Sequence, residues 1–318
     1  MKKRNLLILW AVCSILAVTL TGCQNLEPLV GIVPGPNSSN PYTPTPFRPV
    51  LSTATTAPSV TPSATFTPTI TFTPTPIPCA GEQGRVEVYP AAESGAPLDF
   101  RIYLPPCYGV QADTVYPVLY IIHGQTYNDD QWDRMGLDET AETMIQAREA
   151  APFLIVMPLE VNTYANIYAE PFGTILAKEL VPWIDQNFNT CAERECRALG
   201  GLSRGGAWAL HIGFEIWDVF GSIGAHSTPP FTGDDRLLPI WLETIPPGQI
   251  PRLFLDAGDK DWFLQYTLTY IDLLDRYAVP YEWNFNQGAH DEDYWSAHTG
   301  DYLRWYTQPW NERFEKLP

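Results

Sequence analysis

Basic residues are scarce in this sequence, which has 19 lysines and arginines against 36 aspartates and glutamates among 318 residues. The net charge is therefore −17 at pH 7. A surface this acidic repels phosphate backbones, so no nucleic-acid partner is expected. Charged residues make up only 17% of the chain and hydrophobic residues 45%, a balance that excludes disorder over the whole chain.

The N-terminus has no apolar run of the length that a membrane-spanning helix needs. Leu6–Leu20 is short for that purpose, but it follows a basic start and has the length of a signal-peptide core. It leads into Leu20-Thr21-Gly22-Cys23, which resembles the lipobox of bacterial lipoproteins. Residues 1–22 are thus predicted to be a lipoprotein signal peptide, with Cys23 lipidated as an anchor on the outside of the cytoplasmic membrane or in the outer membrane. The alternative is an ordinary signal peptide, or a short membrane helix, with a chance cysteine.

Residues 23–78 are nearly without charge. Gln24–Pro78 contains 13 prolines and two charged residues, Glu27 and Arg48. Proline removes amide donors and fixes φ, so neither a helix nor a sheet can extend through this segment. We predict a disordered Pro/Thr-rich tether here, with a folded domain at 79–318 that is long enough for one core.

Cysteine is rare, and no two of the six residues show the CxxC spacing typical of zinc sites. Four cysteines remain after the predicted tether begins, and an even number in an exported domain favours two disulfides, with three pairings open. We predict Cys79–Cys107 and Cys191–Cys196, since the second pair flanks a short charged turn and can close a local loop.

Apolar and alternating runs in the predicted domain indicate a mixed α/β fold. Strands are predicted at Arg85–Tyr89, Asp99–Leu104, Val118–His123, Phe153–Pro158, Arg197–Leu202, Ser222–Ala225, Leu253–Ala257 and Tyr281–Phe285. Helices are predicted at Asp138–Ala150, Gly173–Asn187, Gly205–Glu215, Phe263–Ala278 and Asp293–Tyr306. This alternation predicts a mostly parallel central sheet with helices on both faces, after an antiparallel start.

The most informative stretch is Gly201-Leu202-Ser203-Arg204-Gly205, which fits the pattern GxSxG. It follows a predicted strand and precedes a predicted helix, as the nucleophile elbow of α/β-hydrolases does. Glycines are needed there because a Cβ would clash with the neighbouring strand and helix. Ser203 is therefore the candidate nucleophile, and a purely structural glycine turn is the alternative.

A second strand, Leu119–Ile122, ends in His123-Gly124-Gln125. The fold places one oxyanion-hole amide at this position and the other directly after the nucleophile. The candidates are the main-chain N–H groups of Gln125 and Arg204. His123 is interpreted as a structural residue that holds the loop.

The acid and the base of a Ser-His-Asp triad are predicted downstream, in the chain order that this fold requires. Asp256, Asp259 and Asp261 compete as the acid. We favour Asp261, which begins a helical run whose positive end stabilises its charge. His290 lies in a loop after the last strand and is the predicted base. Of the other histidines, His211 is predicted to be packed and His226 to be close enough to line the site. His298 is predicted either to pack or to support a residue of the site.

The motifs together resemble the "putative esterase" family of α/β-hydrolases, over about Gly84 to Tyr306. They are His123-Gly124, Gly201–Gly206, Gly258–Asp261 and Gly288–Trp295. The family includes feruloyl and acetyl-xylan esterases, S-formylglutathione hydrolases, enterochelin esterases and mycolyltransferases. The resemblance implies the α/β-hydrolase fold, with Ser203 as nucleophile, Asp261 as acid and His290 as base. Gln125-Thr126-Tyr127 departs from the glycine-rich loop of many members.

The leading functional hypothesis is a cell-surface carboxylic ester hydrolase that uses an acyl-serine intermediate. Acyl transfer of the mycolyltransferase type and non-catalytic binding on a hydrolase scaffold are the alternatives. The expected partners are a small-molecule or polysaccharide-linked ester and, through the lipid anchor, a membrane. The chemistry requires no cofactor and no metal. Pro229–Pro251, between two predicted strands, is expected to overhang the site as one wall.

Overall fold

The computed structural model of the chain describes residues 81–110 and 113–314. The predicted signal peptide (1–22), the predicted lipidation site Cys23 and the predicted tether (23–78) lie outside these residues, as does Cys79 of the predicted Cys79–Cys107 bridge. Within the described ranges, no helix is both long and apolar enough to cross a membrane.

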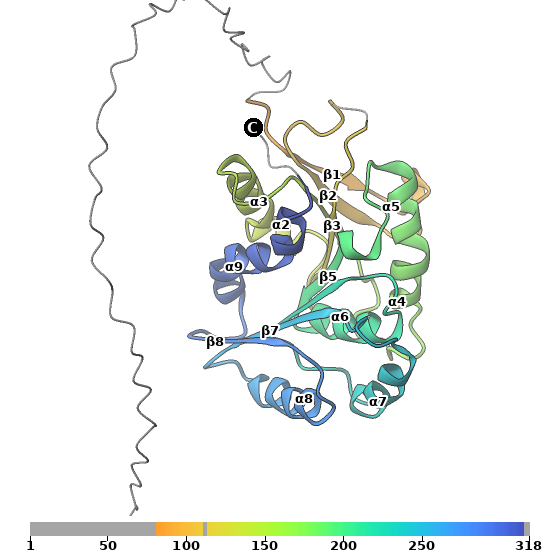
Figure 1. Cartoon of the computed structure of the whole chain (residues 1–318), viewed down its shortest axis with the longest axis vertical. Helices are drawn as coiled ribbons and strands as arrows, with labels where there is room; N and C mark the ends of the chain where they lie inside the picture. The colour runs from red at the N-terminus through yellow and green to blue at the C-terminus, as the bar shows by residue number, and fades with distance from the viewer. Residues whose placement is uncertain (1–80, 111–112, 315–318) are drawn as a thin grey trace, which may run out of the picture. The chain divides into compact units, whose positions relative to one another are not determined.

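An eight-stranded sheet forms the centre of the described domain, in the order β1-β2-β4-β3-β5-β6-β7-β8 (Figure 1). The strands are β1 (Arg85–Tyr89), β2 (Phe100–Leu104), β3 (Val118–Ile122), β4 (Leu154–Pro158), β5 (Arg197–Leu202), β6 (Ser222–His226), β7 (Arg252–Gly258) and β8 (Glu282–Asn286). β2 runs antiparallel to both of its neighbours, and the other pairs are parallel. The predicted fold class is confirmed, and every predicted strand ends within one residue of the observed one.

Helices cover both faces of the sheet, as predicted. They are α1 (Ala91–Ser94), α2 (Gln131–Arg134), α3 (Leu137–Gln146), α4 (Phe172–Ile175), α5 (Val181–Asn187), α6 (Arg204–Glu215), α7 (Asp234–Thr244), α8 (Leu264–Arg276) and α9 (Glu292–Asn311). Figure 1 shows α2, α3 and α9 on one side of the sheet and α4, α5 and α6 on the other. Each side has its own apolar cluster, one around Trp132 and the other around Trp208. Because both faces are covered, all five side chains of β3 are buried, which is why its sequence is uniformly apolar.

Two segments differ from the prediction, and both contain a proline. The continuous helix predicted at Gly173–Asn187 is interrupted by a π-helical turn, Leu176–Leu180. Pro182 lacks an amide hydrogen and its ring crowds the carbonyl four residues earlier, which disfavours a regular α-helix at this point. In Pro229–Pro251, where no helix was predicted, α7 forms with Pro239 inside it.

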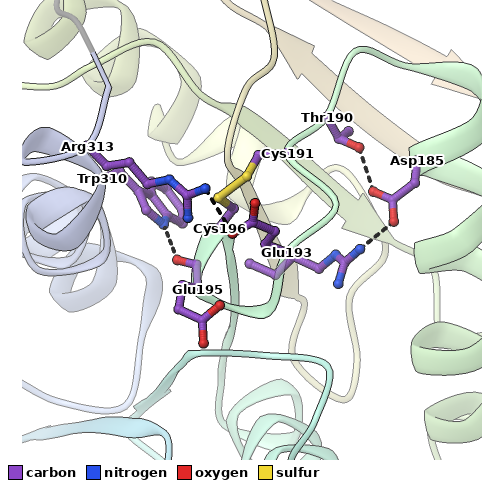
Figure 2. The surroundings of a disulfide bond; sticks show 9 residues. Asp185, Thr190, Cys191, Glu193, Glu195, Cys196, Trp310 and Arg313 are labelled. Carbon is purple, nitrogen blue, oxygen red and sulfur yellow. Dashed lines mark hydrogen bonds and ion pairs between the residues drawn. A yellow bond between two sulfur atoms is a disulfide. The ribbon is translucent and has the colours of Figure 1, made fainter.

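The predicted Cys191–Cys196 disulfide is present and closes a short loop directly before β5. Figure 2 shows that this loop is joined to the end of α9. The indole Nε1 of Trp310 donates to the Glu195 carbonyl over 3.1 Å, and Arg313 forms an ion pair with Glu193 over 2.8 Å. The start of the central strand β5 is therefore tied to the last helix.

Candidate active site

Ser203 occupies a sharp turn between β5 and α6, with φ 52° and ψ −117°. This left-handed conformation is rare for a non-glycine residue and is typical of a nucleophile elbow. A Cβ on Gly205 would collide with the main-chain oxygens of Ile122 and His123, and one on Gly201 would collide with Gly205 itself. The glycines of the motif are therefore required by close approach of main chains, as predicted.

The loop that carries His290 is fastened to the loop that carries Asp261. The Lys260 N–H donates to the Gly288 carbonyl over 2.8 Å, and the Gly288 N–H donates to Asp259 Oδ1 over 2.9 Å. These contacts bring the ends of β7 and β8 together and place the candidate base beside the candidate acid.

Ser203, His290 and Asp261 form one hydrogen-bonded line. His290 Nε2 lies 2.9 Å from Ser203 Oγ, and His290 Nδ1 lies 3.1 Å from each carboxylate oxygen of Asp261. A carboxylate can only accept, so Nδ1 carries the proton and Nε2 is free to accept from the serine hydroxyl. Asp261 Oδ1 also accepts from the Phe263 N–H over 2.7 Å, which fixes the carboxylate in place.

The two competing aspartates have other partners. Asp259 shapes the turn through its contact with Gly288. Asp256 is fully buried and accepts hydrogen bonds from Tyr294 and Tyr302, at 2.6 and 2.8 Å, while also contacting His226 Nδ1 at 2.7 Å. Neither has a hydrogen bond to His290, so the geometry favours Asp261 among the three.

Among the described residues, no other histidine side chain is hydrogen-bonded to Ser203; His226 meets it through the main chain alone, where its carbonyl accepts from the Ser203 N–H over 2.8 Å. His226 was expected to line the site, and this is wrong: it is fully buried, with Nε2 2.9 Å from the Tyr306 hydroxyl. His211 is packed, as expected, with Nδ1 3.0 Å from Asp234. His298 is bonded to Asp301 on the surface of α9.

His123 holds the candidate oxyanion loop, as the sequence indicated. Its Nδ1 lies 2.8 Å from the Gly124 carbonyl, and its Nε2 lies 3.0 Å from the Glu160 main-chain nitrogen. A carbonyl can only accept and an N–H can only donate, so this histidine is neutral with its proton on Nδ1. Burial lowers its pKa, consistent with the neutral form.

Of the two residues that carry the candidate oxyanion amides, Gln125 lines the same cavity as Ser203, and Arg204 follows Ser203 directly in the chain. Arg204 is the first residue of α6, so its N–H has no intrahelical partner. We find no hydrogen bond from the Gln125 N–H to another described residue. Neither donor is thus used by an acceptor among the described residues.

Sequence reasoning missed a segment that supports both amides, Glu160–Thr163, which follows β4. The Glu160 carboxylate is 1% exposed and binds the Arg204 guanidinium at 2.5 to 3.0 Å. The Gln125 side chain donates to the Thr163 carbonyl over 3.1 Å. The available signal was a charged residue just past the end of a uniformly apolar strand, a position that faces the site in parallel sheets.

A cavity of about 560 Å³ opens at Ser203 and His290. We call it the active-site cavity; its aromatic walls are Tyr127, Trp262, Phe263 and Trp295. The expectation that Pro229–Pro251 forms a wall is wrong, because the lining comes from 124–127, 202–203, 262–263, 290–293 and 295. The segment instead forms α7, where Trp241 packs against His211 of α6.

The described residues contain no group of three or more histidine, cysteine, aspartate or glutamate side chains placed to hold a metal ion.

Residues 91–306 match the family described as "Putative esterase". Over 171 residues the chain is 30% identical to an endo-1,4-beta-xylanase/feruloyl esterase of Xylanibacter ruminicola, covering 51% of this chain and 22% of that protein. Over 141 residues it is 34% identical to an esterase of Mycobacterium tuberculosis, covering 41% of this chain and 28% of that protein. The chain thus spans about a quarter of the length of these relatives.

Solved structures share the fold. A ferulic acid esterase superposes with a TM-score of 0.62 at 21% identity, covering 72% of this chain and all of that one. An S-formylglutathione hydrolase of Staphylococcus aureus superposes with a TM-score of 0.58 at 20% identity, covering 71% and 98%. Both likenesses confirm the α/β-hydrolase architecture described above.

Proposed function

This chain belongs to the "Putative esterase" family, and from that premise we propose that it is a serine ester hydrolase acting through Ser203, His290 and Asp261. The observation that carries the proposal is the continuous hydrogen-bonded line from Ser203 Oγ to the Asp261 carboxylate at the wall of an open cavity. Two unengaged amides beside the serine support the same chemistry.

In the proposed reaction, Ser203 Oγ attacks the ester carbonyl carbon while its proton passes to His290 Nε2. The N–H groups of Gln125 and Arg204 stabilise the oxyanion. The ester C–O bond then breaks, the alcohol leaves with the proton from His290, and an acyl-serine remains. Water attacks this intermediate, with His290 again as base, and collapse releases the acid and restores the serine.

The proposed substrates are esters of small or aromatic acids, free or linked to polysaccharide. Two of the relatives reported above are named for feruloyl or ferulic acid esters. The aromatic walls of the active-site cavity support this choice, since Trp262 and Phe263 lie beside His290, with ring centroids 5.9 and 4.9 Å from it.

A panel of nitrophenyl acetate, a longer acyl ester, methyl ferulate and a lactone tests the proposal. The purified protein is expected to hydrolyse at least one ester with a burst of alcohol equal to the enzyme concentration when deacylation is slow. Ser203→Ala is expected to remove the burst and reduce turnover by several powers of ten. If no ester is hydrolysed faster by the native protein than by Ser203→Ala, the proposed function is wrong.

We further propose that the protein is a lipoprotein exported to the cell surface and anchored through Cys23. Cys23→Ser is expected to abolish incorporation of labelled fatty acid and to release the protein from membranes, because the acyl chains supply the membrane affinity. Cys13→Ser, within the predicted signal peptide, is the matched control and should leave labelling unchanged. Continued membrane association of the Cys23→Ser protein, with labelling intact, contradicts the proposal.

A further inference from the structure

A second cavity, of about 370 Å³, lies beside the active-site cavity. We call it the outer groove. The two share one wall, Gln125-Thr126-Tyr127. The rest of the lining of the outer groove comes from Leu159, Glu160, Val161, Thr163 and Tyr164, after β4. No member of the triad lines it.

The outer groove carries large apolar side chains turned to solvent. Tyr164 is 78% exposed and Val161 is 75% exposed, and Tyr127 on the shared wall is 42% exposed. The hydroxyl-bearing residues Thr126 and Thr163 lie among them. An aromatic face bordered by hydroxyl and amide groups suits a ligand with an apolar C–H face and polar edges, which is the chemistry of a sugar ring.

The outer groove offers no uncompensated charge. Glu160 is the one ionisable acid or base other than tyrosine among its lining residues, and its carboxylate is bound by the Arg204 guanidinium through both oxygens. The Arg134 guanidinium lies 5.8 Å from the Tyr127 ring centroid but is paired with Asp130 and Glu292. A phosphate or a carboxylate would therefore meet no unpaired cation there, and a cationic ligand no free anion. The lining therefore favours an uncharged ligand.

The outer groove is also connected to the candidate oxyanion hole. Thr163 of its lining accepts from the Gln125 side chain, and Glu160 holds the side chain of Arg204. A ligand part seated in the groove contacts the same segment that supports both amides. Its position is thus defined relative to the carbonyl that reacts at Ser203.

We propose that the outer groove is a binding subsite for an uncharged sugar unit attached to the ester, and that this unit stacks on Tyr164. The inference rests on the proposed ester hydrolysis. The occupant crosses the Gln125-Thr126-Tyr127 wall, so that the scissile carbonyl lies at Ser203 while the sugar lies in the groove.

The test compares two esters of the same acid, the one that the panel above shows to react best. One is its nitrophenyl ester, and the other is its ester on a short β-1,4-linked xylo-oligosaccharide. For Tyr164→Ala, the ratio of kcat/KM for the oligosaccharide ester to that for the nitrophenyl ester is expected to fall about tenfold, mainly through KM. Tyr164→Trp is expected to keep or raise the ratio. Tyr277→Ala, an exposed tyrosine at the end of α8, is the matched control and should leave it unchanged.

An unchanged ratio in Tyr164→Ala overturns the subsite, and this includes the case in which kcat/KM falls equally for both esters. A separate measurement keeps the test independent of catalysis: titration of the unacylated xylo-oligosaccharide into Ser203→Ala protein, followed by calorimetry. Binding is expected, with weakening of about tenfold or more when Tyr164→Ala is added. If no ester is hydrolysed but the oligosaccharide binds through Tyr164, the proposed function fails and the subsite stands. Absence of binding overturns the subsite even if small esters are hydrolysed.

Discussion

Asp261→Asn is expected to lower kcat for ester hydrolysis by about 10⁴-fold without unfolding the protein. The asparagine Oδ1 can keep the hydrogen bond from the Phe263 N–H, which puts the amide group in the place of Oδ2, the atom 3.1 Å from His290 Nδ1. An amide donates there, which favours the tautomer in which Nδ1 accepts and the histidine proton lies on Nε2. That proton then faces Ser203 Oγ, and the histidine can no longer accept from the serine.

Asp259→Asn is the matched control, two residues away in the same loop. Its role is to accept from the Gly288 N–H, and an asparagine Oδ1 accepts equally well. We expect kcat within a few-fold of the native value. Steady-state kinetics on the best ester of the panel, with circular dichroism to confirm folding, measures both variants. Asp261→Asn within tenfold of native activity, together with a folded and inactive Asp259→Asn, would show that the acid is misassigned.

Glu160→Ala is expected to lower the free energy of unfolding by about 3–5 kcal/mol, because it leaves a buried guanidinium without its counter-charge. The Arg204 side chain is only 11% exposed, so water cannot replace the carboxylate easily. Denaturation by urea measures the change. Activity is expected to fall as well, through kcat more than KM, since the N–H of Arg204 belongs to the proposed oxyanion hole.

The matched comparison is the double variant Glu160→Leu/Arg204→Met, which removes both charges and retains much of the volume. Breaking a buried ion pair is costly, whereas replacing both partners with apolar residues is often close to neutral. The double variant is therefore expected to recover at least half of the free energy of unfolding that Glu160→Ala loses. If the two unfold at the same urea concentration, the guanidinium is solvated in the folded protein and the argument from burial fails.

Much of the fold was predictable from sequence because its signals are local. Uniformly apolar runs such as Val118–Ile122 are what a sheet covered on both faces requires, so the strands could be read directly. The motif around Ser203 was equally readable, because main chains approach too closely there for any side chain. His290 and Asp261 followed from their places after neighbouring strands.

The features that sequence reasoning missed depend on partners far apart in the chain. Glu160 and Arg204 are separated by 44 residues, and neither belongs to a pattern that indicates the other. His226 was placed near the site because it ends a strand, but its ring is directed into the core by contacts with Asp256 and Tyr306. Which way a strand-end side chain turns is decided by such partners, and periodicity does not encode them.

The helix α9 is attached to the rest of the domain at both ends, and this restricts where the fold can accept insertions and deletions. The helix begins directly after His290, its Tyr306 hydroxyl fits against Gly200 of β5, and Trp310 is bonded to the loop before that strand. β5 in turn leads to Ser203, which is hydrogen-bonded to His290. The strand and the helix are therefore held together at both ends. One residue inserted into α9 advances the helix by about 1.5 Å and turns it by about 100°, so the contacts at one of its two ends are lost. Insertions and deletions during divergence should therefore collect in exposed segments such as 246–249, while the length between His290 and Trp310 stays constant.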